Sequence, residues 1–282
     1  MKIQSIQNPN INYKKPVFKK WERTVFNESK SFNFEDILHR NNTIFFRNPS
    51  FWQNAVKFFE KEYKNVPKVN VYCYGCSDGS EAYTFAMTLL TKIGKKAKKY
   101  FPIQAKDYDP VAIEKIQENK YELSNEEQEY IKKNTSNQFK RFLTTLKEKP
   151  VRSKYIYVKV KKNLQDRVDF SLANILEDYK SIEKENSIVF ARNFWPYLGD
   201  IKSLEKQEVL LRNLYKTMGK NSYLIIGDFD TDATNGRIKS VLYKTGFIKT
   251  EIPKIYKRRD ENDIIKTSII KEISEFFQYI TN

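Results

Sequence analysis

The stretch 69–107 constrains the fold more than any other part of the chain. Residues 69–74 are β-branched and aromatic, which predicts a strand. A glycine-bearing turn at 75–79 follows, and from Ser80 apolar residues recur at helical spacing. A second predicted strand, 101–107, then ends at Asp107. A strand, a glycine turn, a helix and a strand ending in an acid form the opening of a nucleotide-binding α/β unit.

The spacing of the hydrophobic residues and the positions of turn residues predict further helices and strands along the chain. Further helices are predicted at 34–40, 50–63, 124–146, 204–218 and 260–280, and further strands at 155–160, 168–172, 187–191 and 222–227. Residues 234–258 predict a helix, a turn at Gly246 and paired strands. Ser50 is the expected N-cap of one helix, and Gly219 is the expected C′ residue that stops another.

Composition excludes several classes of protein. The 282 residues contain no apolar run near the roughly 18 that a membrane span needs. The first residues carry lysines without an apolar run behind them, so no secretory signal is expected. Cys73 and Cys76 are the only cysteines, too few for a disulfide framework. A cytoplasmic location is therefore expected.

The chain is strongly basic, with a net charge of +16. A polyanionic partner such as nucleic acid would explain this charge, and so would an acidic protein partner. A lysine-rich composition with no such partner would explain it equally well. The charge alone leaves these three interpretations open.

The first candidate binding residues come from the 69–107 unit. Gly75 lies in a turn where a ligand can approach the backbone and the N–H groups of the next helix. Asp107 ends a strand, where a carboxylate can accept hydrogen bonds from both ribose hydroxyls of an adenosine. Asp107 could instead cap the following helix, but Asp109, which precedes a proline, is better placed to do so.

Other candidate chemistry is weaker. His39 is the only histidine, which argues against a Ser-His-Asp triad, and neither a nucleophile elbow nor a P-loop occurs. Cys73 and Cys76 form a C-x-x-C at a strand end. Because a redox pair belongs at a helix start and no second pair is present, small buried side chains are the favoured interpretation. No metal is expected.

Four motifs in order resemble those of the CheR-type chemotaxis-receptor methyltransferases. They are TIFFR at 43–47, GCSDGSEAYTFA at 75–86, AKD at 105–107 and ARNFWPY at 191–197. The family pattern runs approximately N-x-T-x-F-F-R, A-x-C-S-x-G-E-E-P-Y-S-x-A, A-T-D-I-D and C-R-N-V-x-I-Y-F. A single motif would be weak evidence, whereas four at matching spacing are specific.

The resemblance implies a fold, a methyl donor and an acceptor. The fold is a Rossmann-like class I methyltransferase, an α/β structure with a seven-stranded, mostly parallel sheet, helices on both faces and a small inserted α+β subdomain. The donor is S-adenosylmethionine, and the acceptor is a glutamate of a chemoreceptor's cytoplasmic domain. The implied domains are an N-terminal arm at 1–40, the methyltransferase domain at 41–258 with its insertion at 121–167, and a C-terminal amphipathic helix at 259–282.

The resemblance also implies roles for individual residues. Near the reacting end of the donor lie Asn41, Thr43 and Arg47, and Tyr197 lies beside Arg47 on the acceptor side. Arg47 and Tyr197 are the expected catalytic residues. The remaining expected donor contacts are Gly75, Glu81 for the amino acid part, Asp107 for the ribose, Asn174 and Ile175 for the adenine, and Asn193 and Phe194 at the end of the fourth strand.

Departures from the family pattern keep two alternatives open. Ser80 and Ala82 replace an acid and a proline, Lys106 replaces a small polar residue, and Ala191 replaces a cysteine. These changes leave the donor residues largely intact but affect the acceptor. A nucleic-acid methyltransferase is one alternative, because NFWPY at 193–197 loosely resembles the N/D-P-P-Y motif of such enzymes. A donor-binding regulatory protein without catalysis is the other.

Overall fold

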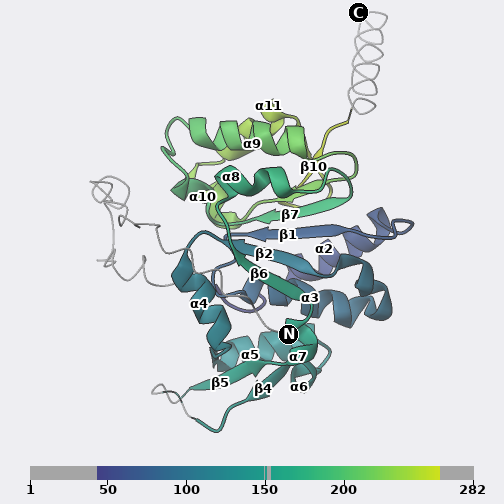
Figure 1. The fold of residues 1–282 in the computed structure, drawn as a ribbon, viewed down its shortest axis with the longest axis vertical. Coiled ribbons are helices and arrows are strands. Elements are labelled where there is room, and N and C mark those ends of the chain that lie inside the picture. Colours follow the sequence, from purple (N-terminus) through teal and green to yellow (C-terminus); the bar gives the residue numbers. More distant parts are fainter. Residues whose placement is uncertain (1–42, 149, 151–153, 261–282) are drawn as a thin grey trace, which may run out of the picture. The chain divides into compact units, whose positions relative to one another are not determined.

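A computed structural model describes residues 43–148, 150 and 154–260 (Figure 1). The predicted N-terminal arm, the helices predicted at 34–40 and 260–280, His39 and Asn41 lie outside these described residues. Among the described residues, no helix combines the length and the apolar character needed to cross a membrane.

The larger sheet has seven strands in the order β6-β2-β1-β7-β8-β10-β9. Its strands are β1 (Asn70–Tyr74), β2 (Ile103–Asp107), β6 (Val168–Leu172), β7 (Ser187–Ala191), β8 (Tyr223–Ile225), β9 (Phe247–Lys249) and β10 (Ile255–Arg258). Neighbouring strands from β6 to β8 are parallel, whereas β10 runs antiparallel to both β8 and β9. This architecture confirms the predicted Rossmann-like, mostly parallel seven-stranded sheet.

Helices cover both faces of the sheet (Figure 1). On one face lie α2 (Pro49–Glu62) and α3 (Ser80–Lys92), and on the other lie α8 (Ile175–Asp178), α9 (Glu205–Thr217) and α11 (Arg237–Thr245). Two apolar clusters fill the layers. Cys73 packs in the cluster of α2 and α3, while Tyr72 and Tyr74 pack in the cluster of α9 and α11. This alternation along β1 is what a strand buried on both faces requires.

Shorter helices connect the strands of the larger sheet. They are η1 (Gly94–Tyr100), α4 (Pro110–Glu118), η2 (Tyr179–Ser181), η3 (Trp195–Tyr197) and α10 (Asp228–Ala233). Asp109 caps α4 as predicted, because its Oδ1 accepts a hydrogen bond of 3.0 Å from the Val111 N–H. The prediction of Ser50 as a cap is wrong. The helix α2 begins at Pro49 after the left-handed Asn48, and Ser50 lies in its first turn.

A second sheet of three antiparallel strands, in the order β3-β5-β4, lies between α4 and β6 in the sequence. Its elements are β3 (Tyr121–Ser124), α5 (Asn125–Asn134), α6 (Phe139–Phe142), β4 (Leu143–Thr145), β5 (Tyr155–Val160) and α7 (Lys162–Gln165). The prediction of one helix over 124–146 is wrong. Left-handed φ angles of 51° at Ser136 and 61° at Asn137 end α5, and Leu143 pairs with Val160 as a strand. The division into domains stays a prediction.

Gly219 does not stop α9 by adopting a left-handed conformation. The C-cap Met218 is extended, with φ −68° and ψ 133°, and the positive-φ glycines do not include Gly219. Instead, the Gly219 N–H donates to the Lys184 carbonyl, and a Cβ at this position would lie 2.4 Å from that oxygen. Glycine is required here by a close approach of two backbones.

The strand order changes direction between β1 and β7. The chain proceeds from β1 through β2 to β6 on one side, and from β7 to β8 on the other. In open α/β sheets, ligands bind outside the carboxyl ends of the strands at such a switch point. The loop after β1 begins at Gly75 and the loop after β7 begins at Arg192, so these two loops border the expected crevice.

Candidate functional site

The loop after β1 is held to the end of β2 by Asp107. The Ser77 N–H donates to Asp107 Oδ2 at 2.7 Å, and the Asp109 N–H donates to Oδ1 at 3.0 Å. Asp107 is buried, with 7% of its surface exposed. Burial raises the pKa of this carboxyl, although its hydrogen bonds from the Asp109 and Ser77 N–H groups lower it. Asp107 thus fixes the shape of the turn after β1, which begins at Gly75.

This turn fits the polar groups of an adenosyl donor. The Ser77 hydroxyl is buried and has no hydrogen-bond partner among the residues that the structure describes. A carboxylate has about four lone-pair positions, so Asp107 keeps capacity to accept from ribose hydroxyls. Gly75 is exposed and has a φ of +66°. A ligand can therefore approach its backbone closely.

Phe194 lies against Gly75 and links the two loops. A Cβ built on Gly75 would lie 3.0 Å from the Phe194 ring. The ring is half-buried and stacks on Trp195, with ring centroids 5.5 Å apart and an interplanar angle of 13°. The structure therefore brings together two of the predicted donor residues, Gly75 from the β1 loop and Phe194 from the β7 loop.

An ion pair between Glu81 and Arg192 crosses the switch point. Arg192 Nη1 lies 2.7 Å from Glu81 Oε2, and the two side chains are 2% and 17% exposed. The Arg192 guanidinium also lies 4.9 Å from the ring centroids of both Phe51 and Trp52. The predicted donor contact Glu81 therefore has a second function as the partner of a buried cation. The prediction did not include Arg192, although it precedes Asn193 in the 191–197 motif.

Asn193 and Asp230 close the loop after β7. The Asn193 Oδ1 accepts a hydrogen bond of 3.2 Å from the Phe229 N–H. Asp230 accepts three backbone hydrogen bonds, from Asn193 at 2.7 Å, Trp195 at 3.1 Å and Gly227 at 2.6 Å. A Cβ on Gly227 would lie 1.9 Å from Asn193 Oδ1, so glycine is needed there. Sequence reasoning missed Asp230, since no pattern links it to a loop 37 residues away.

Arg47 and Tyr197, the two predicted catalytic residues, lie near each other on the surface. Tyr197 is 68% exposed and stacks on Phe229 with ring centroids 5.6 Å apart. Desolvation raises the pKa of the Tyr197 phenol and the Asp230 carboxylate raises it further, while the Arg47 guanidinium lowers it. The Arg47 carbonyl accepts a 2.8 Å hydrogen bond from Trp52 Nε1. Thr43 precedes this turn and is half-buried.

Asn174 and Ile175 begin α8 beside the end of β2. The Asn174 Oδ1 accepts a hydrogen bond of 3.0 Å from the Leu176 N–H, so this predicted adenine contact also serves as an N-cap. Asn174 is exposed, whereas Ile175 is buried, with 6% of its surface exposed. The Ala173 N–H donates to the Asp107 carbonyl at 2.8 Å, which places this turn directly beside the predicted ribose acid.

A polar network fixes α8 to the sheet on the face of β2 opposite to the Asp107 side chain. Lys106 Nζ lies 2.7 Å from Asp178 Oδ2, which also accepts hydrogen bonds of 2.6 Å from Tyr74 Oη and 3.0 Å from Ser181 Oγ. The Lys106 side chain is 11% exposed. These bonds lower the pKa of Asp178 despite the opposing effect of its burial. The departure of Lys106 from the family pattern therefore has a structural consequence.

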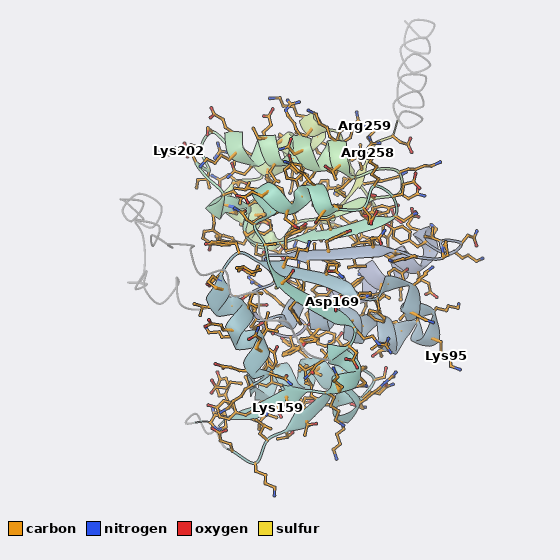
Figure 2. The ribbon with its side chains drawn as sticks, in the orientation of Figure 1. Lys95, Lys159, Asp169, Lys202, Arg258 and Arg259 are labelled. Atoms are coloured by element: carbon orange, nitrogen blue, oxygen red, sulfur yellow. The ribbon has the colours of Figure 1, made fainter. Side chains whose placement is uncertain are left out.

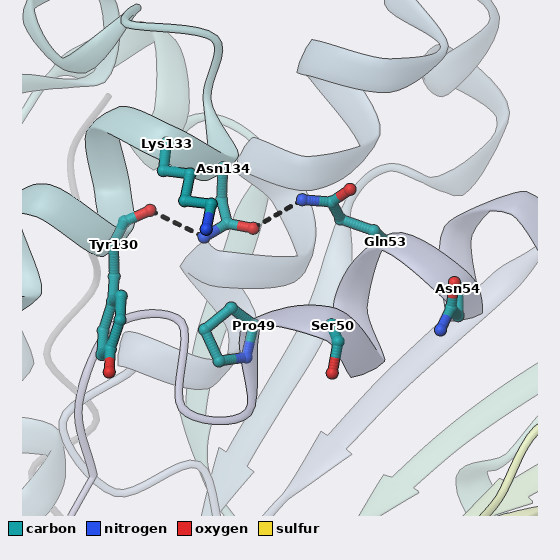
Figure 3. Close-up of a pocket in the computed structure, with 7 residues that line it drawn as sticks. All are labelled: Pro49, Ser50, Gln53, Asn54, Tyr130, Lys133 and Asn134. Carbon is teal, nitrogen blue, oxygen red and sulfur yellow. Dashed lines mark hydrogen bonds between the residues drawn. The ribbon is translucent and has the colours of Figure 1, made fainter.

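A pocket of about 240 Å³ opens at another place, between α2 and α5 (Figure 3). Two of its polar side chains are linked by a hydrogen bond. Gln53 Nε2 donates to Asn134 Oδ1 at 2.7 Å, and Asn134 Nδ2 donates to the Tyr130 carbonyl at 2.8 Å. Because Gln53 and Asn134 already have partners and none of the predicted site residues lines this pocket, the switch point bordered by the β1 and β7 loops remains the candidate site.

The Asp230 carboxyl generates a prediction about pH. Burial raises its pKa from 3.8 to about 6, although its backbone hydrogen bonds oppose this. The folded chain then binds the proton more tightly than the unfolded chain. The resulting stabilisation is fully present below pH 3.8 and is lost as the pH rises through about 6. Asp78, whose pKa is also raised to about 6, contributes in the same direction.

We expect Asp230→Asn to remove the Asp230 part of this pH dependence. Denaturant unfolding at several pH values measures it. The free energy of unfolding of the wild type, relative to the variant, should fall by roughly 2.4 kcal/mol between about pH 4 and about pH 7. A difference between the two proteins that stays constant over this range would contradict the raised pKa.

Comparison with known proteins agrees with this geometry. The chain matches the family described as CheR methyltransferase, SAM binding domain, over residues 41–245. None of the curated proteins compared with the chain matches it.

Three similar solved structures illustrate the range of matches, all at low identity. One is precorrin 8W decarboxylase from Methanobacterium thermoautotrophicum, with 14% identity over 69% of this chain and 72% of that chain and a TM-score of 0.35. Another is magnesium protoporphyrin IX methyltransferase from Synechocystis PCC 6803 with bound SAM, with 11% identity over 81% and 84% and a TM-score of 0.37. The third is coclaurine N-methyltransferase, with 15% identity over 62% of this chain but only 35% of that chain and a TM-score of 0.32.

The family match covers well over half of the sequence and includes all four motifs named above. The chain therefore belongs to the CheR methyltransferase family, and it is an S-adenosylmethionine-dependent methyltransferase with a Rossmann-like fold.

Proposed function

We propose that this methyltransferase acts on a glutamate carboxylate of a protein, in the cytoplasmic domain of a chemoreceptor. The observation that carries the proposal is that Arg47 and Tyr197 are both exposed, and that the Arg47 guanidinium is near enough to lower the pKa of the Tyr197 phenol. A guanidinium beside a phenol offers a planar cation and a hydroxyl to an acceptor group. Such a pair suits an acceptor that is a carboxylate on the surface of another protein.

The donor side would be formed by the crevice residues. Asp107 and Ser77 would accept or donate hydrogen bonds at the ribose, Ile175 would cover the adenine, and Glu81 would bind the amino acid part. When bound, S-adenosylmethionine supplies a methyl group that its sulfonium has already activated. Phe194, lying over Gly75, would exclude water from the adjoining part of the crevice.

The proposed acceptor also suits a chain that contains a single histidine. A glutamate carboxylate is ionised at neutral pH and needs no general base to become a nucleophile. His39, the only histidine of the sequence, lies outside the described residues. The protein's task is then to align the acceptor, and positioning of this kind can supply about 7–11 kcal/mol. Arg47 would orient the carboxylate through paired N–H donors, and Tyr197 would orient it through its hydroxyl.

The chemical stability of the methylated product tests the proposal. Purified enzyme would be incubated with S-adenosylmethionine carrying a labelled methyl group and with membranes that contain chemoreceptors. We expect label on a membrane protein that mild alkali releases, because methyl esters of glutamate hydrolyse under those conditions. Alkali-stable label on added RNA or DNA would instead support the nucleic-acid alternative. Tight donor binding with no label on either acceptor would support a regulatory protein without catalysis.

Arg47→Ala should reduce turnover much more than it weakens donor binding. We expect kcat to fall by at least about 100-fold, as for loss of one positioned charge-stabilising donor. Arg47→Lys keeps the charge without the planar fork and should give an intermediate rate. The matched control is Arg212→Ala, because Arg212 is an exposed arginine that pairs with Glu208 on α9 at 2.6 Å. Unchanged kcat in Arg47→Ala would reject the role assigned to Arg47.

Asp107→Ala and Asp109→Ala should separate donor binding from helix capping. Loss of charge-assisted hydrogen bonds to the ribose should weaken the affinity for S-adenosylhomocysteine by at least about tenfold, measured by titration calorimetry. Asp109→Ala removes the cap of α4 and should cost about 1 kcal/mol of stability with little change in that affinity. Equal losses of affinity in the two variants would mean that Asp107 acts only through the shape of the loop.

A further inference from the structure

The positive charge of the chain is concentrated in two short stretches. Residues 57–68 and 92–99 together hold nine lysines, two glutamates and no arginine or aspartate. These 20 residues therefore carry a net charge of +7, out of +16 for the whole chain. The concentration distinguishes this region from a surface that is basic only because lysine is common throughout the sequence.

The two stretches form one continuous surface. Lys96 Nζ of η1 lies 3.7 Å from Glu60 Oε1 of α2, and the Val69 N–H donates to the Lys99 carbonyl at 2.8 Å. The Tyr100 hydroxyl donates to the Phe59 carbonyl at 3.0 Å. We call this area the lysine surface. Its exposed members are Lys57, Lys61, Lys64, Lys68, Lys92, Lys95, Lys96 and Lys98.

This arrangement of lysines contributes little to the stability of the fold. Lys57 and Lys61 are spaced i, i+4 on α2, where like charges repel and destabilise a helix. Lys61 and Lys92 lie in the last turns of α2 and α3, so the helix dipole favours those two residues. The lysines at 95, 96 and 98 follow α3 on η1, outside that turn. Figure 2 shows Lys95 on the rim of the structure, pointing outward.

The composition of the surface indicates which polyanion it suits. The aromatic residues of these stretches are buried, with Phe58 6% exposed and Phe59 and Tyr63 0% exposed, so none is available to stack on a nucleic-acid base. Arginine, which binds single phosphates through two parallel hydrogen bonds, does not occur in either stretch. A cluster of lysines suits diffuse attraction to an anionic phospholipid surface, where each residue raises the partition coefficient about fivefold.

The lysine surface lies at the opposite ends of the strands from the candidate site. Lys68 lies two residues before the start of β1, and η1 leads into the start of β2, so the surface lies at the amino ends of these strands. Gly75 and Asp107 lie at the carboxyl ends of the same strands. Five residues of strand span roughly 17 Å. An anionic surface bound at the lysine surface would therefore leave the crevice open.

We propose that the lysine surface adsorbs the protein to anionic phospholipid membranes, with the methyltransferase crevice turned away from the lipid. The adsorption is electrostatic and reversible, and no segment inserts into the bilayer. It does not depend on the identity of the methyl acceptor. It would, however, hold the enzyme near a membrane-bound substrate, such as the chemoreceptor proposed above.

Vesicle flotation tests this inference without any measurement of methyl transfer. The probes are vesicles of phosphatidylcholine alone and of an equimolar mixture of phosphatidylcholine and phosphatidylserine. We expect the full chain to float with the mixed vesicles at low salt, to be released by high salt, and not to float with the neutral vesicles. The triple variant Lys95→Glu, Lys96→Glu, Lys98→Glu should bind the mixed vesicles at least about 100-fold more weakly.

The matched control changes net charge equally at exposed lysines elsewhere. This control is the triple variant Lys159→Glu, Lys202→Glu, Lys249→Glu. Lys159 lies on β5, Lys202 lies before α9, and Lys249 lies on β9. This control should keep most of the binding, and both triple variants should keep wild-type affinity for S-adenosylhomocysteine. Equal losses in the two triple variants would overturn the inference, because net charge alone would then explain binding. Equal flotation with neutral and mixed vesicles would also overturn it. So would binding of polyuridylic acid that is tighter than binding of the mixed vesicles and that is lost in the Lys95/Lys96/Lys98 triple variant.

Discussion

The buried ion pair between Arg192 and Glu81 is the contact on which the geometry of the site depends. Arg192 follows the last residue of β7, and Glu81 lies in the first turn of α3, so one bond of 2.7 Å connects the two loops at the switch point. The guanidinium packs against Phe51 and Trp52 of α2, which excludes water from it. Loss of either charge would leave the other buried and unpaired, at a cost of about 3–5 kcal/mol.

The other carboxylates of the site act first on the backbone. Asp107 accepts N–H bonds from the loop after β1, and Asp230 accepts three from the loops after β7 and β8. Asn174 and Asn193 likewise use their side-chain oxygens on neighbouring N–H groups. A site formed by loops can hold a ligand in one orientation only if the loops themselves are fixed. These residues therefore combine loop structure with the binding roles that the family resemblance implies.

Sequence reasoning located the elements that are defined by local pattern. The strands predicted at 155–160, 168–172 and 187–191 match the bounds of β5, β6 and β7. Every residue of β7 is buried, and its nearly continuous apolar run is what a strand covered on both faces requires. The helix predicted at 124–146 was wrong because helical spacing continues through a segment where Leu143 finds a strand partner in Val160. Arg192 and Asp230 were missed for the same reason. Their partners lie 111 and 37 residues away, and no local pattern records such distances.

The site divides into a constrained half and an exposed half. On the donor side, Lys106 binds Asp178 beneath the end of β2, and thereby fixes α8 and its Ile175 relative to Asp107. Ion pairs and backbone hydrogen bonds within the chain hold these residues in place. Tyr197, the proposed acceptor contact, is 68% exposed. Among the described residues, Phe229 is the only aromatic residue whose ring contacts its ring. A constrained set of predicted donor residues beside an exposed Tyr197 would suit the proposed enzyme, whose donor is constant and whose acceptor would complete the site with its own surface.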